Sequence, residues 1–306
     1  MCAALDVSIA GYHAWTKCTQ YLSNVQAAQH TSKHVGDIAQ AAREEHTKGR
    51  GVYGAKRLYT RLCQRGFSLS LSGVKRLRRK LGLVQHHKKR WVCTTDSKHN
   101  LAVAPNLLEQ RFNTCTAPNQ VWVADITYID TDEGWLYLAG VKDLYTKKLV
   151  GWAMAQHMEA SLVAQAVHMA IKRNAPGTGL IAHSDRGSQY ASDKYRRVLA
   201  QHSMRQSMSR RGNCYDNAPM ESFWASLKKE CVHGKRYQTR TQARADIFDY
   251  IETFYNTTRL HSALAMSPLE FEAQYWSGFA KHTEQARTDP RGQAWGRPSP
   301  CTPFFI

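Results

Sequence analysis

A nine-residue stretch, VWVADITYI, constrains the fold of this 306-residue chain more than any other. Alternation places Val121, Val123 and Asp125 on one face of a strand, and the apolar residues between them lie on the other face. Because both faces are apolar, the strand is predicted to be central in a sheet and covered on both sides. A carboxylate at that depth is costly unless a cation or a hydrogen-bond donor satisfies it. Asp125 is therefore either a buried salt-bridge partner or a ligand of a metal ion.

The pattern around this strand predicts an α/β domain. Further strands are predicted within residues 135–145, 147–157, 179–185 and 204–209, and helices within 160–174, 192–202, 217–231 and 241–256. Three strands followed by alternating helices and strands are typical of a mixed sheet flanked by helices. Residues 283–306 are polar and dotted with proline, and they are predicted to form a loose tail.

The basic charge is concentrated ahead of this domain. The formal net charge of the chain is +18, and residues 41–90 hold 15 Lys or Arg against 2 Asp or Glu, a net +13. Residues 118–282 hold 20 against 16, a net +4. A polyanion is the natural partner of such a concentration, because neutralising phosphates releases their counterions. A solvated basic face is the alternative, and it explains the concentration less well.

The basic segment also has the pattern of several short helices. Helices are predicted over residues 36–46, 55–65 and 72–81, separated by turns rich in glycine or serine. The third is a basic helix with an apolar stripe, and five side chains lie largely off that stripe: Lys75, Arg76, Arg78, Arg79 and Lys80. Short helices, tight turns and a basic last helix are typical of a helix-turn-helix module that contacts DNA, although other small helical bundles share the arrangement.

Two further acids stand where they could join Asp125. Asp185 ends the short strand in AHSDRGSQY, and Glu221 lies in the first turn of the helix predicted in NAPMESFWASLKKEC. Taken singly, Asp185 is explained as well by a turn and Glu221 by the favourable end of the helix dipole. Together the three supply the oxygen ligands that Mg²⁺ takes. Two such ions about 3.5–4 Å apart can activate the attacking oxygen and stabilise the leaving one in phosphoryl transfer.

Two basic side chains accompany this set of acids. Lys228 follows Glu221 by seven residues, nearly two helical turns, so it is predicted to share a face with Glu221 and to hold a DNA phosphate. A solvated lysine is the alternative. His183 precedes Asp185 by two residues and is predicted to support that carboxylate from behind, with an ordinary histidine at the end of a strand as the alternative.

Four separated motifs agree in order and spacing with a known family. They are VWVADITYI, HSDRGSQY, SMSRRGNCYDNAPMESFWASLKKE and YNTTRLHSALAMSPLEFE, and 35 residues separate Asp185 from Glu221. In these motifs the chain resembles the OrfB-type transposases of insertion sequences, whose catalytic core with two aspartates and a glutamate belongs to the retroviral-integrase-like superfamily. GVYGAKRLYTRL and the basic segment after it resemble the helix-turn-helix ahead of that core. The resemblance covers about residues 36–275.

The resemblance implies an RNase H-like mixed sheet flanked by helices, preceded by a small all-α helix-turn-helix domain. It divides the chain into five parts: residues 1–35 of unassigned role, a helix-turn-helix DNA-binding domain over 36–95, a linker over 96–117, the integrase-like catalytic core over 118–282, and a C-terminal tail over 283–306. It also implies that Asp125, Asp185 and Glu221 are the catalytic residues and hold two Mg²⁺ or Mn²⁺ ions.

The implied activity is metal-dependent cleavage and strand transfer of DNA without a covalent protein–DNA intermediate. The implied partners are the DNA ends of the element, target DNA, further copies of the chain, and a smaller upstream protein with its own helix-turn-helix and leucine zipper. Two other functions stay open from the residues: a helix-turn-helix regulator whose second domain is not catalytic, and an RNase H-like nuclease that only hydrolyses.

Cysteine usage and hydropathy agree with an intracellular setting. The eight cysteines are scattered without a CxxC pair, so a disulfide framework is not predicted. No apolar run approaches the roughly 20 residues of a membrane span, so no membrane partner is expected. We expect a cytoplasmic, nucleoid-associated bacterial protein.

Overall fold

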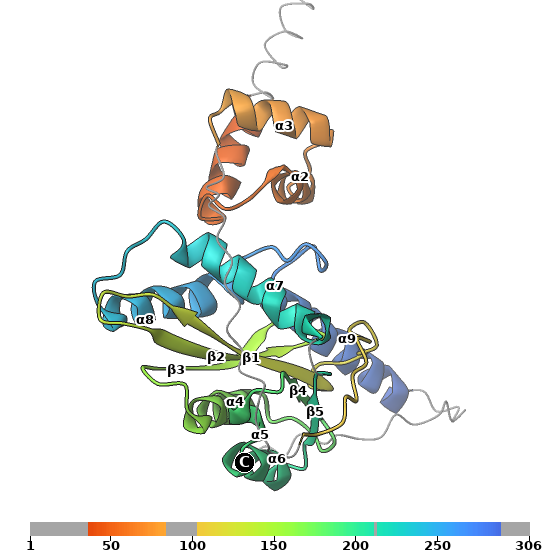
Figure 1. Ribbon diagram of the computed structural model, residues 1–306. Helices are drawn as coiled ribbons and strands as arrows, with labels where there is room; N and C mark the ends of the chain where they lie inside the picture. The colour runs from red at the N-terminus through yellow and green to blue at the C-terminus, as the bar shows by residue number, and fades with distance from the viewer. Residues whose placement is uncertain (1–35, 84–102, 211–212, 289–306) are drawn as a thin grey trace, which may run out of the picture. The chain divides into compact units, whose positions relative to one another are not determined.

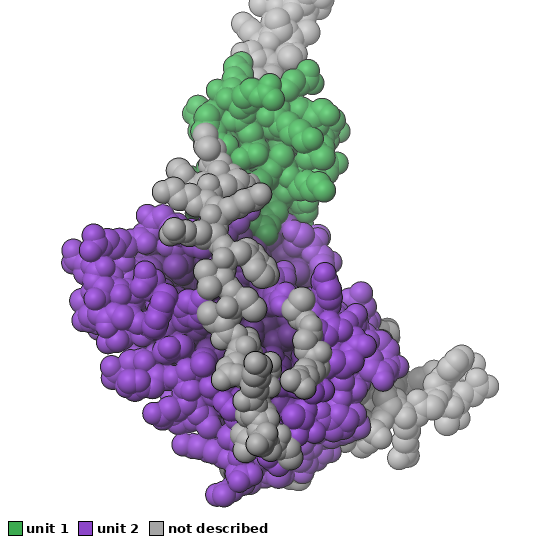
Figure 2. Space-filling model, in the orientation of Figure 1, with its two compact units in different colours: residues 1–86 green, residues 87–306 purple. Residues whose placement is uncertain are grey.

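The chain divides into two compact units, Met1–His86 and His87–Ile306 (Figure 2). The computed structural model describes residues 36–83, 103–210 and 213–288. The predicted N-terminal segment, the first part of the predicted linker and most of the predicted tail lie outside these ranges, and so does the predicted boundary after residue 95. No helix in the described ranges is both long enough and apolar enough to cross a membrane.

The first unit contains the predicted short helices. Residues 36–48 are helical, and α2 (Ala55–Gln64) and α3 (Leu71–Lys80) follow, with a short turn between them. Leu58, Leu62 and Val74 are fully buried and pack with two alanines of the first helix, so one apolar cluster holds the three helices together. The Ser70 hydroxyl accepts a hydrogen bond from Gly73 N at 3.0 Å and caps α3. The predicted helix-turn-helix arrangement is confirmed.

The second unit is built on a five-stranded mixed sheet. Its strands are β1 (Val121–Ile129), β2 (Leu136–Asp143), β3 (Leu149–Ala155), β4 (Ile181–Ser184) and β5 (Arg205–Met208). Their order is β3-β2-β1-β4-β5, with antiparallel pairs from β1 to β3 and parallel pairs from β1 to β5. The predicted central position of β1 and the RNase H-like α/β fold are therefore confirmed.

Helices cover both faces of this sheet (Figure 1). α4 (Ala160–Asn174), α5 (Ser188–Ala191) and α6 (Asp193–Gln201) share a buried apolar cluster with Trp122 and Ala124 of β1. α7 (Ala218–Leu227) packs on the opposite face, where Asp125 lies. On the α4 side, Gly151 of β3 allows very close approach, because an added Cβ would lie 2.2 Å from Ala166 O.

Two of the predicted helices continue as π-helical segments, which the sequence pattern did not predict. Lys228–Val232 follows α7, and Tyr250–Tyr255 follows α8 (Arg240–Asp249). Glu230 in the first segment accepts hydrogen bonds from Arg259 Nε at 2.6 Å and Arg259 Nη2 at 2.7 Å. Both side chains are almost fully buried. Burial lowers the pKa of Arg259, but hydrogen bonds to Glu230 raise it, and the net pKa lies above its usual value.

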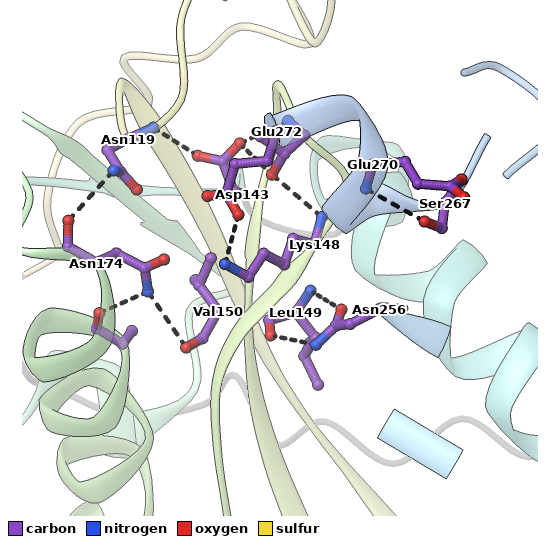
Figure 3. A network of polar contacts seen from close by, with 12 residues as sticks. Asn119, Asp143, Lys148, Leu149, Val150, Asn174, Asn256, Ser267, Glu270 and Glu272 are labelled. Atoms are coloured by element: carbon purple, nitrogen blue, oxygen red, sulfur yellow. Dashed lines mark hydrogen bonds and ion pairs between the residues drawn. The ribbon is translucent and has the colours of Figure 1, made fainter. Parts of the chain in front are cut away.

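The C-terminal part corrects the predicted domain boundary. α9 spans Pro268–Thr288, so the predicted start of the tail at residue 283 falls inside a helix. α9 is fastened to the sheet by Lys148, whose Nζ lies 2.6 Å from Glu272 Oε2 (Figure 3). At its start, the Ser267 hydroxyl accepts a hydrogen bond from Glu270 N at 3.2 Å. The polar composition of this region concealed a helix that is held by tertiary contacts.

A single asparagine protects the edge of the sheet at β3. Asn256 Oδ1 accepts a hydrogen bond from Leu149 N at 3.0 Å, and Asn256 Nδ2 donates to Leu149 O at 3.1 Å (Figure 3). β3 is an edge strand, and unpaired backbone groups at an edge invite pairing with other chains. The buried amide of Asn256 thus takes the place of a neighbouring strand at this position.

Replacing Gly151 by alanine is expected to destabilise the second unit by about 3 kcal/mol, because the new methyl group would force α4 away from β3. Chemical denaturation of the purified chain measures the effect. Gly278→Ala is the matched control, because Gly278 lies in α9 with no atom within 4 Å of an added Cβ. That substitution should be neutral or stabilise by up to about 1 kcal/mol. Equal effects of the two substitutions would contradict the close packing of β3 and α4.

Candidate functional site

Asp125 lies at the middle of the central strand and is held by a tryptophan of α7. Trp224 Nε1 donates a hydrogen bond to Asp125 Oδ2 at 3.0 Å. Gly140 of β2 lies opposite Asp125 and leaves space for the indole, because an added Cβ would lie 2.8 Å from Trp224 Cη2. The sequence analysis singled out the acid but did not predict its donor, since the two residues are 99 positions apart.

Asp185 is brought beside Asp125 by the pairing of two parallel strands. Ala124 of β1 is the register partner of Ser184 of β4, so each aspartate is the next residue after a paired position. Asp185 Oδ1 also accepts a hydrogen bond from Gly187 N at 2.9 Å. Asp185 is therefore a turn residue, as one interpretation of the sequence held, and it is also a neighbour of Asp125.

The pKa of Asp125 depends on the charges of the other two acids. Burial, the charge of Asp185 and, to a smaller extent, the charge of Glu221 raise the pKa of Asp125 to about 8. Hydrogen bonds from Ile126 N and Trp224 act the other way. Burial also raises the pKa of Glu221, which lies in the first turn of α7 as predicted. Three acids whose charges oppose one another form a site prepared for a cation.

The donor set fits a hard divalent cation. Mg²⁺ keeps several waters and needs only one or two protein carboxylates, which Asp125 and Asp185 provide. In the three described ranges, no group of three or more His, Cys, Asp or Glu side chains already stands in an arrangement that could hold a metal ion. Glu221 therefore acts on Asp125 through its charge but does not complete a three-ligand group in the described residues.

The start of α7, which carries Glu221, is fastened to the sheet by two side chains. Asn217 Nδ2 donates a hydrogen bond to Ala124 O at 3.2 Å, next to Asp125 in the chain. Lys142 Nζ, from β2, donates to Pro219 O at 3.1 Å. Burial lowers the pKa of Lys142 to about 7, and the charges of Lys147 and Arg259 lower it further. Asn217 precedes α7 as expected, but its side chain bonds the sheet instead of capping the helix.

Asp216 has a larger role than its position in a turn suggested. Its carboxylate is fully buried and accepts hydrogen bonds from the Arg210 guanidinium at 2.9 and 3.1 Å. Asn106 Nδ2 donates to it at 3.0 Å and Gln110 Nε2 at 2.7 Å. These bonds, led by those from Arg210, hold the pKa of Asp216 well below its usual range. Asp216 therefore joins three separate segments just before α7.

His183 does not support Asp185 in the predicted way. Its Nδ1 lies 2.8 Å from Ser207 Oγ, and its Nε2 lies 3.0 Å from Asp216 O. Burial lowers the pKa of His183 to about 4, so the ring is neutral and bridges β4, β5 and the turn ahead of α7. The correction has a simple physical reason: His183 lies inside β4, where its ring reaches β5 and the turn ahead of α7, whereas Asp185 follows the end of the strand.

Lys228 lies close to the acids, at the point where α7 ends and the π-helical segment begins. Its ammonium is 5.0 Å from the centroid of the Tyr128 ring. Burial lowers the pKa of Lys228, and the charge of Asp125 raises it, so the two side chains are within electrostatic reach. This position is compatible with the prediction that Lys228 shares a helix face with Glu221.

The basic helix α3 presents four of its five predicted DNA contacts to solvent. Lys75, Arg76, Arg79 and Lys80 are exposed. Arg78 differs, because it is half-buried and its Nη2 donates a hydrogen bond to Leu83 O at 3.0 Å. Arg78 therefore stabilises the end of α3, and the candidate DNA contacts of this helix are the four exposed side chains.

Comparisons with known proteins agree with this geometry. Two models of the integrase core domain match residues 116–214 and 221–275. An uncharacterized 31 kDa protein of insertion element IS600 from Shigella sonnei is 45% identical, over 90% of this chain and 98% of its own length. The transposase InsF of insertion sequence IS3A from Escherichia coli strain K12 is 40% identical, over 89% of this chain and 92% of its own length. The chain belongs to the insertion-sequence transposases with an integrase core.

The matched segments of this transposase family contain the three acids. Asp125 and Asp185 lie in the first segment, and Glu221 is the first residue of the second. Among solved structures, the HTLV-2 integrase catalytic core domain in complex with magnesium aligns with a TM-score of 0.40 at 12% identity. That alignment covers 51% of this chain and 98% of the other.

Asp125→Asn is expected to stabilise this transposase at alkaline pH. The folded-state pKa of Asp125, about 8, exceeds the value of about 4 in an unfolded chain. The folded state therefore binds the proton more tightly, and stability falls as pH rises from about 4 to about 8. Asparagine removes that loss, so the gain in Tm over wild type should grow across this interval and then level off.

Thermal unfolding in chelator-treated buffers measures this gain. Asp130→Asn is the matched control, since Asp130 is an exposed carboxylate just beyond the same strand. Its Tm should follow that of the wild type at every pH. A difference for Asp125→Asn that stays constant from pH 4 to pH 8 would contradict a buried Asp125 that binds a proton near neutrality.

Proposed function

We propose that the chain cleaves the ends of an insertion sequence and joins them to target DNA by metal-dependent phosphoryl transfer. The observation that carries the proposal is the placement of Asp125 and Asp185 side by side on parallel strands, with Glu221 on a helix that is fastened to the same strand. Membership of the transposase family supports the same activity. A regulator without catalytic function would not need a buried aspartate whose pKa is raised by two further acids.

In this proposal Asp125, Asp185 and Glu221 hold two Mg²⁺ or Mn²⁺ ions. When bound, the ions activate the attacking oxygen and stabilise the leaving oxygen. Asp125 and Asp185 would provide the part of the site that is already assembled, and Glu221 would supply the third carboxylate. Trp224 keeps Asp125 oriented, and Lys228 holds a phosphate next to the scissile bond.

The reaction has two steps of the same kind. Water first attacks the phosphorus at the element end, and the bond to the departing 3′ oxygen breaks, which leaves a free 3′-OH on the element. That hydroxyl then attacks a phosphorus of the target strand, so one P–O bond forms as another breaks. We propose that copies of the chain assemble on the two element ends, with α3 gripping DNA. The smaller upstream protein stays a prediction.

Asp125→Asn, Asp185→Asn and Glu221→Gln should each lower cleavage and joining at least 10³-fold, because each removes a charge that the ions require. The assay uses oligonucleotides with the ends of the insertion sequence that encodes the chain, in Mg²⁺ or Mn²⁺. Glu230→Gln is not a suitable control, since Glu230 is buried against Arg259. Glu159→Gln is suitable, because Glu159 is exposed and lies before α4.

The products distinguish the three functions. Joined products that depend on the three acids support a transposase. Hydrolysis without joining would indicate a nuclease, and DNA binding with neither product would indicate a regulator. Near-normal cleavage by any one of the three variants would remove that residue from the metal site.

Arg76→Ala combined with Arg79→Ala should weaken DNA binding at least tenfold. Both side chains are exposed on α3, so each lost phosphate contact should flatten the dependence of log affinity on log salt by about one. Arg78→Ala is the matched comparison within the same helix. It should lower stability and leave the salt slope unchanged, because its guanidinium bonds Leu83 O. An unchanged salt slope for the double variant would mean that this face of α3 is only solvated.

A further inference from the structure

Trp135 is exposed although the backbone around it is held by side-chain hydrogen bonds. Trp135, between β1 and β2, is 47% exposed. Its ring contacts Tyr128 of β1 edge-to-face, with centroids 4.7 Å apart. A cation lies beside this pair of rings, since Lys228 Nζ is 5.0 Å from the centroid of Tyr128. The three side chains form a set that we call the aromatic platform: Trp135, Tyr128 and Lys228.

The backbone that carries Trp135 is held by two arginines from the segment before and within α8. Arg240 Nε donates a hydrogen bond to Trp135 O at 3.1 Å, and Arg240 Nη2 donates to Glu133 O at 2.6 Å. Arg236 forms an ion pair with Asp132 at 3.0 Å. These contacts hold the backbone at Trp135 while about half of its ring stays open to solvent.

The aromatic platform lies within a few nucleotides of the three acids. Lys228, which lies over the Tyr128 ring, follows Glu221 by seven residues, about 10 Å along the helix. That distance spans about three nucleotides at the duplex rise of 3.4 Å per phosphate. Lys228 links the two places, because it lies over the Tyr128 ring and feels the charge of Asp125.

We propose that the aromatic platform stacks an unpaired base of the DNA end, within about three nucleotides of the scissile phosphate. The proposal rests on the proposed function and adds a binding site to it. Exposed aromatic rings beside a cation are the usual means of holding single-stranded bases, because every base offers a face to stack on. Lys228 holds the phosphate of the same strand, and Trp135 holds a base that has left the duplex. Stacking in this place keeps the frayed end from closing again over the acids.

The test uses a duplex with the terminal sequence of the insertion sequence that encodes the chain and two unpaired nucleotides at the end. One unpaired position carries 5-iododeoxyuridine, which crosslinks to a stacked aromatic side chain on irradiation. The reaction is run with the full chain in Ca²⁺, so that no cleavage is needed. Mass spectrometry of the crosslinked peptide should identify Trp135.

Three variants separate stacking from simple apolar bulk. Trp135→Leu should lower the crosslink yield and the affinity for the frayed duplex about tenfold, and Trp135→Phe should keep at least a third of both. Trp276→Ala is the matched control, since Trp276 is 48% exposed on α9. It should leave both measurements unchanged. The fully paired duplex should bind wild type and Trp135→Leu equally well.

The outcomes distinguish this proposal from the proposed function. A wild type that cleaves ends while its crosslink persists in Trp135→Leu would overturn the platform and leave the transposase activity. A chain that crosslinks through Trp135 but never cleaves in Mg²⁺ would keep the platform and contradict the activity. If Trp135→Leu instead altered only the sedimentation of the free chain, Trp135 would belong to an interface between copies, and the platform would be wrong.

Discussion

The hydrogen bond between Trp224 and Asp125 is the interaction on which the candidate site depends. It satisfies a carboxylate on the central strand, where desolvation and a second aspartate both oppose its charge. The bond also ties α7 to the face of the sheet where Glu221 is needed. Gly140 is required by the same contact, because any larger residue would occupy the space of the indole. The packing against Gly140, the position of α7 and the pKa of Asp125 therefore all depend on this one hydrogen bond.

Contacts in the turn before α7 add to this hydrogen bond and fix where the helix that carries Glu221 begins. Asn217 donates a hydrogen bond to the backbone of β1. The carboxylate of Asp216 accepts hydrogen bonds from Arg210 and from two polar side chains that precede β1. His183 of β4 bonds the backbone of the same turn. Apart from the bond between Arg210 and Asp216, each contact joins residues that are more than 30 positions apart in sequence. Contacts with the sheet thus determine where the helix that carries Glu221 begins. Asn217, at the N-cap position, makes no side-chain hydrogen bond to the helix backbone.

The strands and most helices could be predicted because each leaves a local pattern. The three acids were singled out for the same reason, and their joint role as a metal site stays a prediction. Asp125 stood out as a charge in an apolar alternation, and Asp185 and Glu221 by their spacing. Trp224, Asp216 and Lys142 could not be assigned roles, since their partners lie on other elements and no periodicity connects them. His183 was given the wrong neighbour because its ring bonds Ser207 of β5 and the backbone of Asp216, which are 24 and 33 positions away in sequence. α9 was cut short since its polar composition resembles a tail.

The buried pair of Glu230 and Arg259 has a consequence for how the chain is made. Breaking such a pair costs about 3–5 kcal/mol, so the region after α7 is not secure until Arg259 has been synthesised. Glu221, the last of the three acids, leaves the ribosome 38 residues earlier. At about 5–20 residues per second, that gap is on the order of 5 s. A nascent chain therefore carries all three acids for a few seconds before the pair of Glu230 and Arg259 can form behind α7.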